Sequence, residues 1–410
     1  MTTEITKILE GFKKYSENPY LDSINFLRDY IEVDPSSEAF FELGKALFFN
    51  GEYLESIKHL EKSNDPRSDA YIGLNYYKMN DYPSAIRHLR NFLRDNRNET
   101  ILSYLMLSYE NEHDFKNAVK CGDMLLEINP ENDSVKVHLA DCHYKAREYE
   151  KSLIYLNELN DSKLKYKKAL VLFKLKRYIE AIEEVKSMKT VEAYRLMSRS
   201  YERLGKPAKA VMCMQNAYKL DYNVETLFEI AEIYSKNANH QNAANIMERI
   251  LRTDPENEKA LEMIAESHFE LQNFELALTY CNDLLKVNEK NYKAYLILSE
   301  TYMYLNDSVK SIEYAEKGLE MNPESSDLWI QKAWAYYPTD FEEFKKSFEK
   351  ALKLEPNNIT NYIRLIEQCR WEGESENAQR YYERLLFYNP ACTMSFDEIY
   401  NGRIVKGHDY

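Results

Sequence analysis

The chain has 410 residues, of which 44% are hydrophobic and 30% are charged, with only 10 Gly and 11 Pro. This composition can bury a large core, which excludes the collagen-like and intrinsically disordered classes. The 54 Lys and Arg residues against 68 Asp and Glu give a net charge of −14. General nucleic-acid binding is disfavoured, because such a chain repels a phosphate backbone unless positive charge gathers on one face.

The sequence repeats itself at intervals of 29 to 34 residues. A column of small residues, each followed four positions later by an apolar one, marks the period. It contains Ser56, Ala85, Ala118, Ser152, Ala181, Ala210, Ala243, Ala277, Ser311 and Ala378, with Phe344 as its one large member. A second column lies twelve residues upstream of most of these positions and includes Gly44, Gly73, Ala140, Ala169, Ser198, Ala231, Ala265 and Ser299. A period of this length is typical of stacked repeat proteins.

Each repeat reads as a helical hairpin. Residues 294–304 carry apolar side chains at helical spacing, Asn306 and Asp307 favour a turn, and residues 309–321 form a second amphipathic pattern before Pro323. Small residues in both columns allow the two antiparallel helices to approach closely. One hairpin cannot cover both of its faces, so about twelve in series predict a continuous all-α solenoid without β-strands.

In chain order, the first unit (residues 3–33) follows the pattern weakly, which is typical of a cap. Three units are only 29 residues long and are expected to lose the end of their second helix, near residues 64–66, 160–162 and 188–190. Many units end at an Asp-Pro, Asn-Pro or Glu-Pro step, where a helix is disfavoured. The solenoid is predicted to span residues 1–390, and residues 391–410 to form a capping segment and tail.

The repeats resemble the tetratricopeptide repeat (TPR) superfamily. The 34-residue pattern of that family places Trp, Leu-Gly, Tyr, Ala and Pro at fixed positions. Residues 326–356, with Trp329, Ala333, Tyr336, Ala351 and Pro356, match it well, as does the unit before it with Leu298, Ser299, Tyr302 and Pro323. The resemblance covers residues 3–390. It implies a right-handed α-solenoid of about twelve TPR hairpins and a non-catalytic scaffold or adaptor that binds a peptide or protein.

TPR proteins bind partners in a concave groove lined by their first helices. The family positions predict a partner-binding set in this chain of Phe41, Lys45, Phe48, Tyr77, Lys78, Tyr144, Lys145, Tyr166, Phe173, Lys174, Arg195, Arg199 and Arg203. The Lys-x3-Asn pair with which some relatives hold a terminal carboxylate is absent, since Phe41 and Lys45, or Val137 and Asp141, stand there.

The predicted groove is aromatic and basic at first and acidic later, where it carries Glu232, Glu262, Glu266, Glu270, Glu300 and Glu367. An extended acidic segment with apolar anchors is therefore expected to bind between Phe41 and Arg203. Apolar residues on the inner face can instead simply pack against the next repeat. Two other functions stay open: a regulator whose array responds to a ligand, and a structural subunit of a larger assembly.

No catalytic motif is present. The chain lacks phosphate-binding loops, a nucleophile elbow and an H-E-x-x-H pair, so an enzymatic role is not expected. His138 and Cys142 share a helix face beside His143, but two or three such side chains fall short of a zinc site. His143 occupies a packing position, so a core histidine with a small thiol beside it is expected. No metal or cofactor is predicted.

The six cysteines are scattered without a C-x-x-C pair, which favours reduced thiols and a cytoplasmic setting. The longest apolar runs span about five residues, whereas a membrane-spanning helix needs about 20. The N-terminus also lacks the apolar region of a secretion signal. Neither export by a standard signal nor membrane insertion is predicted.

Overall fold

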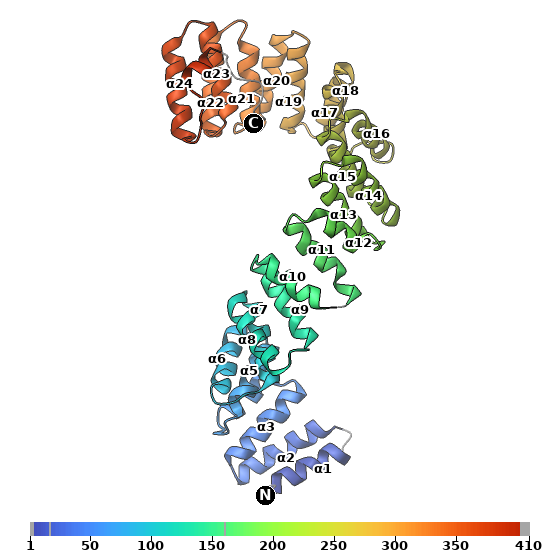
Figure 1. Ribbon diagram of the computed structural model, residues 1–410, viewed down its shortest axis with the longest axis vertical. Coiled ribbons are helices and arrows are strands. Elements are labelled where there is room, and N and C mark those ends of the chain that lie inside the picture. Colours follow the sequence, from blue (N-terminus) through green and yellow to red (C-terminus); the bar gives the residue numbers. More distant parts are fainter. Residues whose placement is uncertain (1–3, 16–17, 160, 402–410) are drawn as a thin grey trace. The chain divides into compact units, whose positions relative to one another are not determined.

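The computed structural model describes residues 4–15, 18–159 and 161–401, and within these ranges it contains 25 α-helices and no strand. The helices follow one another as antiparallel pairs (Figure 1). The chain divides into two compact units, residues 1–189 and 190–410. The prediction of an all-α TPR-like array is confirmed, whereas a single solenoid bounded at residue 390 stays a prediction.

The first unit consists of six hairpins. Its helices are α1 (Glu4–Tyr15), α2 (Pro19–Val33), α3 (Ser37–Asn50), α4 (Tyr53–Leu60), α5 (Ser68–Lys78), α6 (Tyr82–Leu93), α7 (Glu99–Asn111), α8 (Phe115–Ile128), α9 (Asp133–Lys145), α10 (Tyr149–Glu158), α11 (Lys165–Lys174) and α12 (Tyr178–Val185).

The second unit has six further hairpins and a short final helix. These are α13 (Val191–Arg203), α14 (Pro207–Leu220), α15 (Val224–Lys236), α16 (His240–Leu251), α17 (Glu258–Glu270), α18 (Phe274–Val287), α19 (Tyr292–Tyr304), α20 (Ser308–Met321), α21 (Ser326–Tyr336), α22 (Phe341–Leu354), α23 (Ile359–Trp371), α24 (Ser375–Tyr388) and α25 (Phe396–Tyr400).

The two columns of small residues meet inside the hairpins. The Ser56 hydroxyl donates to the Gly44 carbonyl oxygen at 2.6 Å, and the Ser152 hydroxyl donates to that of Ala140 at 2.7 Å. A Cβ on Gly44 would lie only 2.5 Å from the Cγ atom of Leu60. The close approach of paired helices that the sequence predicts is therefore confirmed.

The hairpin turns share one backbone feature. In ten of them the residue two positions before the second helix has a positive φ angle; it is Gly in three turns and non-Gly in seven, such as Ala238 with φ 54°. Most helices begin after a Ser, Thr, Asp or Asn whose side chain accepts a hydrogen bond from a backbone N–H of the first turn, as Asp307 does for α20.

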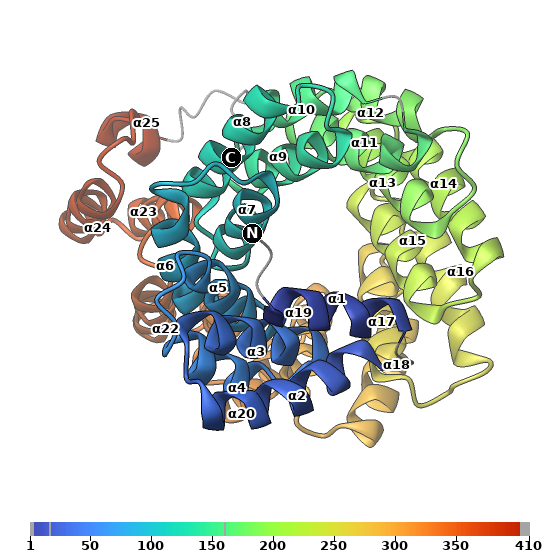
Figure 2. The ribbon, with the colours of Figure 1, turned by 90° about the horizontal axis from the view of Figure 1, so that it is seen from below.

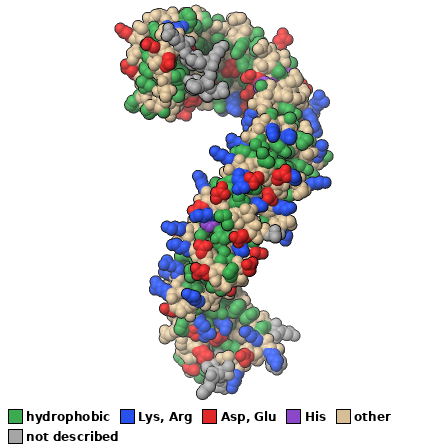
Figure 3. Space-filling view, viewed as in Figure 1, with side chains coloured by type: hydrophobic (Ala, Val, Ile, Leu, Met, Phe, Trp, Pro, Cys, Tyr) green, Lys and Arg blue, Asp and Glu red, His purple; other side chains and the backbone are tan. Residues whose placement is uncertain are grey.

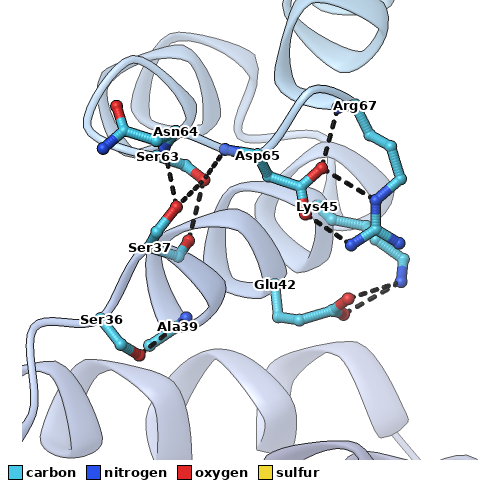
Figure 4. Close-up of polar contacts among 9 residues, drawn as sticks. All are labelled: Ser36, Ser37, Ala39, Glu42, Lys45, Ser63, Asn64, Asp65 and Arg67. Atoms are coloured by element: carbon cyan, nitrogen blue, oxygen red, sulfur yellow. Dashed lines mark hydrogen bonds and ion pairs between the residues drawn. The ribbon is translucent and has the colours of Figure 1, made fainter.

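The three shortened repeats lose part of their second helix, as predicted. Helices α4, α10 and α12 have 8, 10 and 8 residues, whereas the other second helices from α6 to α24 have 12 to 14. After α4, side chains take the place of the missing turn (Figure 4). The backbone N–H of Asn64 donates to the Ser37 hydroxyl at 2.8 Å, and that of Asp65 donates to the Ser63 hydroxyl at 3.1 Å.

The prediction that His143 packs in the core is confirmed. His143 is buried and stacks on Tyr155, which lies twelve residues later on the second helix, with ring centroids 5.7 Å apart. His268 stacks on Tyr280 in the same way at 5.5 Å. Some of the aromatic side chains of the second helices thus serve the contact between paired helices.

The end of the described chain continues the packing of the last hairpin. The buried Ile399 anchors α25 in the core of the last repeats, and the Tyr382 hydroxyl donates to the Met394 carbonyl oxygen at 2.9 Å. The predicted tail at residues 402–410 lies outside the described residues. Among the described helices, none is both long enough and apolar enough to cross a membrane.

Candidate functional site

In the first unit, the odd-numbered helices lie on the inner side of the curve. Figure 2 shows α7, α9 and α11 on the inside and their partners α8, α10 and α12 on the outside. Consecutive first helices touch through their side chains: Tyr77 of α5 packs edge-on against Tyr104 of α7 at 5.0 Å, and Lys167 of α11 pairs with Asp141 of α9 at 2.7 Å. The surface formed by α3, α5, α7, α9 and α11 is called the first-helix face below.

The predicted aromatic anchors lie at the turn end of this face. Phe48, Tyr77, Tyr144 and Phe173 are each partly exposed. Each ring packs against the tyrosine five residues later, which begins the second helix: Tyr53, Tyr82, Tyr149 and Tyr178, with centroids 5.4 to 6.1 Å apart. The contact holds each ring in place while part of it stays accessible, which suits an anchor for an apolar side chain.

Phe41 is placed differently from the other predicted anchors. Its side chain is fully buried with Leu60 and Ile72, and the Arg67 guanidinium covers its ring at 4.1 Å. Phe41 therefore packs between repeats and offers no surface to a partner. Its neighbour Lys45 is ion-paired with Glu42 at 3.0 Å, and Arg67 is paired with Asp65 at 2.6 Å on the same side of α3 (Figure 4).

The N-terminal end of the first-helix face contains a cavity of about 590 Å³. Its walls come from α1, α2, α3 and the start of α5, and include Tyr20, Phe49, Tyr71 and Lys45. The Tyr20 and Phe49 rings stack at 5.2 Å, and both are exposed. Burial raises the pKa of the Tyr71 hydroxyl. The mixture of rings and paired charges can accept an apolar side chain next to polar backbone.

Three of the predicted lysines remain available. Lys78, Lys145 and Lys174 end the first helices α5, α9 and α11, and all three are exposed. Within the described residues none of them forms an ion pair, although the Lys145 amine lies 5.7 Å from the centre of the Phe115 ring. Tyr166 of α11 is partly buried close to Tyr144. Aromatic rings and free cations thus alternate along this part of the face.

The predicted arginine stripe belongs to α13 of the second unit. Arg195 is ion-paired with Glu229 of α15 at 3.1 Å and also donates to the Thr226 hydroxyl at 3.3 Å. Arg199 and Arg203 are exposed and form no ion pair within the described residues. The charge of Arg195 is thus neutralised by the next repeat, and two of the three guanidinium groups are available.

Farther along the second unit, first helices carry carboxylates. Glu262 is neutralised by Lys293 at 2.6 Å. Glu300 accepts a hydrogen bond from the Gln331 amide at 2.9 Å and has no ion pair with any residue that the structure describes. Burial and the neighbouring Asp327, Glu270 and Glu266 carboxylates raise the pKa of Glu300 to about 7. The negative charge on these helices repels anions, and it also disfavours the ionised form of Glu300.

The His138 and Cys142 pair is joined by Glu110 of the preceding repeat. One carboxylate oxygen of Glu110 lies 3.1 Å from the His138 Nδ1 atom and 3.5 Å from the Cys142 Sγ atom. The carboxylate raises the pKa of His138, and burial raises that of the Cys142 thiol to about 12. The thiol is therefore protonated at neutral pH, and no group of three side chains suited to a metal occurs in the described ranges.

Models of known protein families match several of these repeats. Models of the tetratricopeptide repeat match residues 228–295, 292–325 and 326–358. Residues 228–358 belong to the tetratricopeptide repeat family. A further model, described as anaphase-promoting complex, cyclosome, subunit 3, matches residues 111–188. A search of curated proteins returned no match. Tetratricopeptide-repeat proteins act as protein-interaction scaffolds or as subunits of assemblies.

Several solved structures match the chain at low sequence identity. The complex of Naa15 and Naa10 bound to HypK-THB is 12% identical, with a TM-score of 0.46, covering 92% of this chain and 68% of that one. The Cut9–Hcn1 tetramer of the anaphase-promoting complex is 12% identical, with a TM-score of 0.42 and 94% coverage of both chains. The protein TTC0263 of Thermus thermophilus is 17% identical, with a TM-score of 0.38, covering 43% of this chain and 98% of that one.

Sequence reasoning missed several residues of the first-helix face. Tyr71 and Tyr104 pack beside the predicted anchors, and Arg67 covers Phe41. Tyr71 and Tyr104 lie one position after a TPR groove position, so an aromatic count on the neighbouring positions could have found them. Arg67 lies in the link between α4 and α5, and the repeat pattern does not predict the path of that link.

Proposed function

We propose that this TPR chain is a non-catalytic interaction scaffold whose first-helix face holds an extended acidic segment of a partner protein. The observation that carries the proposal is the series of partly exposed rings, Phe48, Tyr77, Tyr144 and Phe173, beside the unpaired Lys78, Lys145 and Lys174. Stacked repeats need only their neighbours for stability and gain nothing from leaving these cations unpaired.

In this proposal the two kinds of side chain have separate roles. The rings bury apolar side chains of the partner and slow its dissociation. The lysines attract its carboxylates and speed association, because exposed charges act mainly on the rate of encounter. Arg199 and Arg203 of the second unit supply the same attraction at α13 and are tested separately.

The test compares charge and ring variants on an identified partner. Reversal of Arg199 and Arg203 to Glu, or of the three lysines to Glu, is expected to slow association and flatten its salt dependence. Phe173→Ala is expected to speed dissociation with little effect on association. Surface plasmon resonance at 50 and 200 mM salt measures both rates. Unchanged rates in every variant would refute the assignment of the face.

A second candidate function is that of a structural subunit of a larger assembly. The match of residues 111–188 to a family model of an assembly subunit favours it. In that case the chain should co-purify with other proteins in a fixed stoichiometry, and removing the first-helix lysines should leave that stoichiometry unchanged. Cross-linking mass spectrometry of the native complex distinguishes the two.

A further inference from the structure

A second cleft of the first unit lies away from the first-helix face. It has a volume of about 540 Å³ and is lined by the end of α6, the link 94–98, and residues of α7 and α8. We call it the α6–α8 cleft. Because α6 and α8 are second helices, the cleft opens between the outer helices of adjacent repeats, above α7. A volume of this size is in the range of ordinary ligand sites.

The floor of the cleft is apolar. Leu102 and Leu105 of α7 are buried beneath it, whereas Met124 and Ile128 of α8 are 52% and 50% exposed along its side. Two large side chains that are half exposed beside a cavity are available to cover a further apolar group. The floor therefore favours a ligand with a large aliphatic or aromatic side chain.

Three arginines surround this floor. Arg90, Arg94 and Arg97 all line the cleft and are exposed, and within the described residues none of them forms an ion pair. Figure 3 shows Lys and Arg side chains gathered over the edge of the molecule at α6. The Asp95 and Glu127 carboxylates also line the cleft, so its charged groups sum to one net positive charge.

Arg90 acts on the floor itself. Burial raises the pKa of the Cys121 thiol to about 11, and the charges of Lys120 and Arg90 oppose this rise. Burial also raises the pKa of the Tyr109 hydroxyl, and the positive charge of Arg90 opposes that rise. The positive charge of Arg90 thus acts on Cys121, which lines the same cleft, and it can attract an anion that enters above the leucines.

The arginines have one structural role that must be separated from binding. Arg90 and Arg94 stand at the end of α6, where a cation stabilises the helix dipole. Arg97 stands outside both helices and has no such role. Guanidinium groups pair with carboxylates through two parallel hydrogen bonds, so three of them favour an acidic ligand.

We propose that the α6–α8 cleft is a second docking site of this chain, which takes a partner-protein segment with a large apolar side chain flanked by carboxylates. The apolar side chain contacts Leu102, Met124 and Ile128, and the flanking carboxylates pair with Arg94 and Arg97. This site lies on the outer helices and does not depend on the function proposed for the first-helix face.

The test uses the full chain and a fluorescein-labelled probe peptide, Glu-Glu-Leu-Phe-Glu-Glu, followed by fluorescence anisotropy. The double variant Arg94→Gln with Arg97→Gln is expected to weaken binding at least tenfold, and Met124→Ser to weaken it severalfold. All three residues are exposed, so the fold should persist, which circular dichroism checks. The matched control, Lys58→Gln on α4 with Lys116→Gln on α8, changes two exposed cations outside the cleft and should leave binding unchanged.

Several results would overturn the proposal. These are no binding at millimolar probe, equal binding of the peptide Glu-Glu-Ser-Ser-Glu-Glu, an equal loss in the control variant, or a loss only when Lys78, Lys145 and Lys174 are changed. The last result would place the peptide on the first-helix face. Sedimentation of the chain alone gives another result that would overturn the proposal. If the chain forms an oligomer that dissociates in the Arg94→Gln, Arg97→Gln variant, the cleft binds a second copy of the chain.

Discussion

Gly44 offers a sharp test of the helix interface, because a single methyl group decides the outcome. A Cβ at this position would lie 2.5 Å from Leu60 Cγ, 2.8 Å from Leu60 Cδ2 and 3.1 Å from the Ser56 carbonyl oxygen. Leu60 is fully buried and cannot swing into solvent. Gly44→Ala should therefore force the two helices of the hairpin apart.

The expected magnitude combines two opposing effects. Overpacking costs about 1–3 kcal/mol, whereas replacing Gly by Ala inside a helix gains about 1 kcal/mol. The net change is a loss of up to about 2 kcal/mol. Gly11→Ala in α1 is the matched control, since nothing lies within 4 Å of a Cβ there. It should gain up to about 1 kcal/mol from helix propensity alone.

Urea denaturation followed by circular dichroism, with amide exchange of α3 and α4, measures the difference between the two variants. Exchange localises the effect, which matters because repeat arrays need not unfold in one step. If Gly44→Ala stabilised the chain as much as Gly11→Ala does, the small column would not mark the interface between paired helices.

Three more outcomes are expected. Ala277→Leu and Ala243→Leu, both at fully buried positions, should each cost about 1–3 kcal/mol in urea denaturation, whereas Thr279→Leu on the exposed side of α18 should change stability little. Ala238→Gly should raise the melting temperature by relieving a positive φ angle, with a gain of about 1 kcal/mol, and Ala238→Val should lower it. Because Glu300 has a folded pKa of about 7, above its unfolded value near 4.5, stability should fall by up to about 3 kcal/mol as pH rises from 4.5 to 8; a Glu300→Gln variant with the same pH profile would exclude this source.

The hairpins were predictable because the residues between their two helices recur at fixed positions in each repeat. Residues such as Gly44 and Ser56 lie twelve positions apart within one hairpin, so the repeat itself reports which helices touch. The shortened second helices were predictable for the same reason, since a spacing of 29 leaves too few residues for a full helix. The division at residue 189 is not readable in this way, although it falls at one of the shortened repeats.

The chemistry of the face was only partly predictable, because it depends on contacts between repeats. Phe41 fits a groove position, yet Arg67 and Tyr71 of the next repeat bury it. Arg195 fits a basic stripe, yet Glu229, 34 residues later, neutralises it. The family pattern predicts on which face of a helix a side chain lies. Contacts with the next repeat decide whether that side chain is free to bind a partner.

The most direct test of the proposed binding face is the association rate of a partner captured with the full chain. The variant Lys78→Glu, Lys145→Glu, Lys174→Glu is compared with a control, Lys58→Glu, Lys116→Glu, Lys120→Glu, which places the same charge change on exposed positions of α4 and α8. A much slower association in the first variant and a near-normal rate in the control are expected. Equal rates in the two variants would contradict the assignment of the first-helix face.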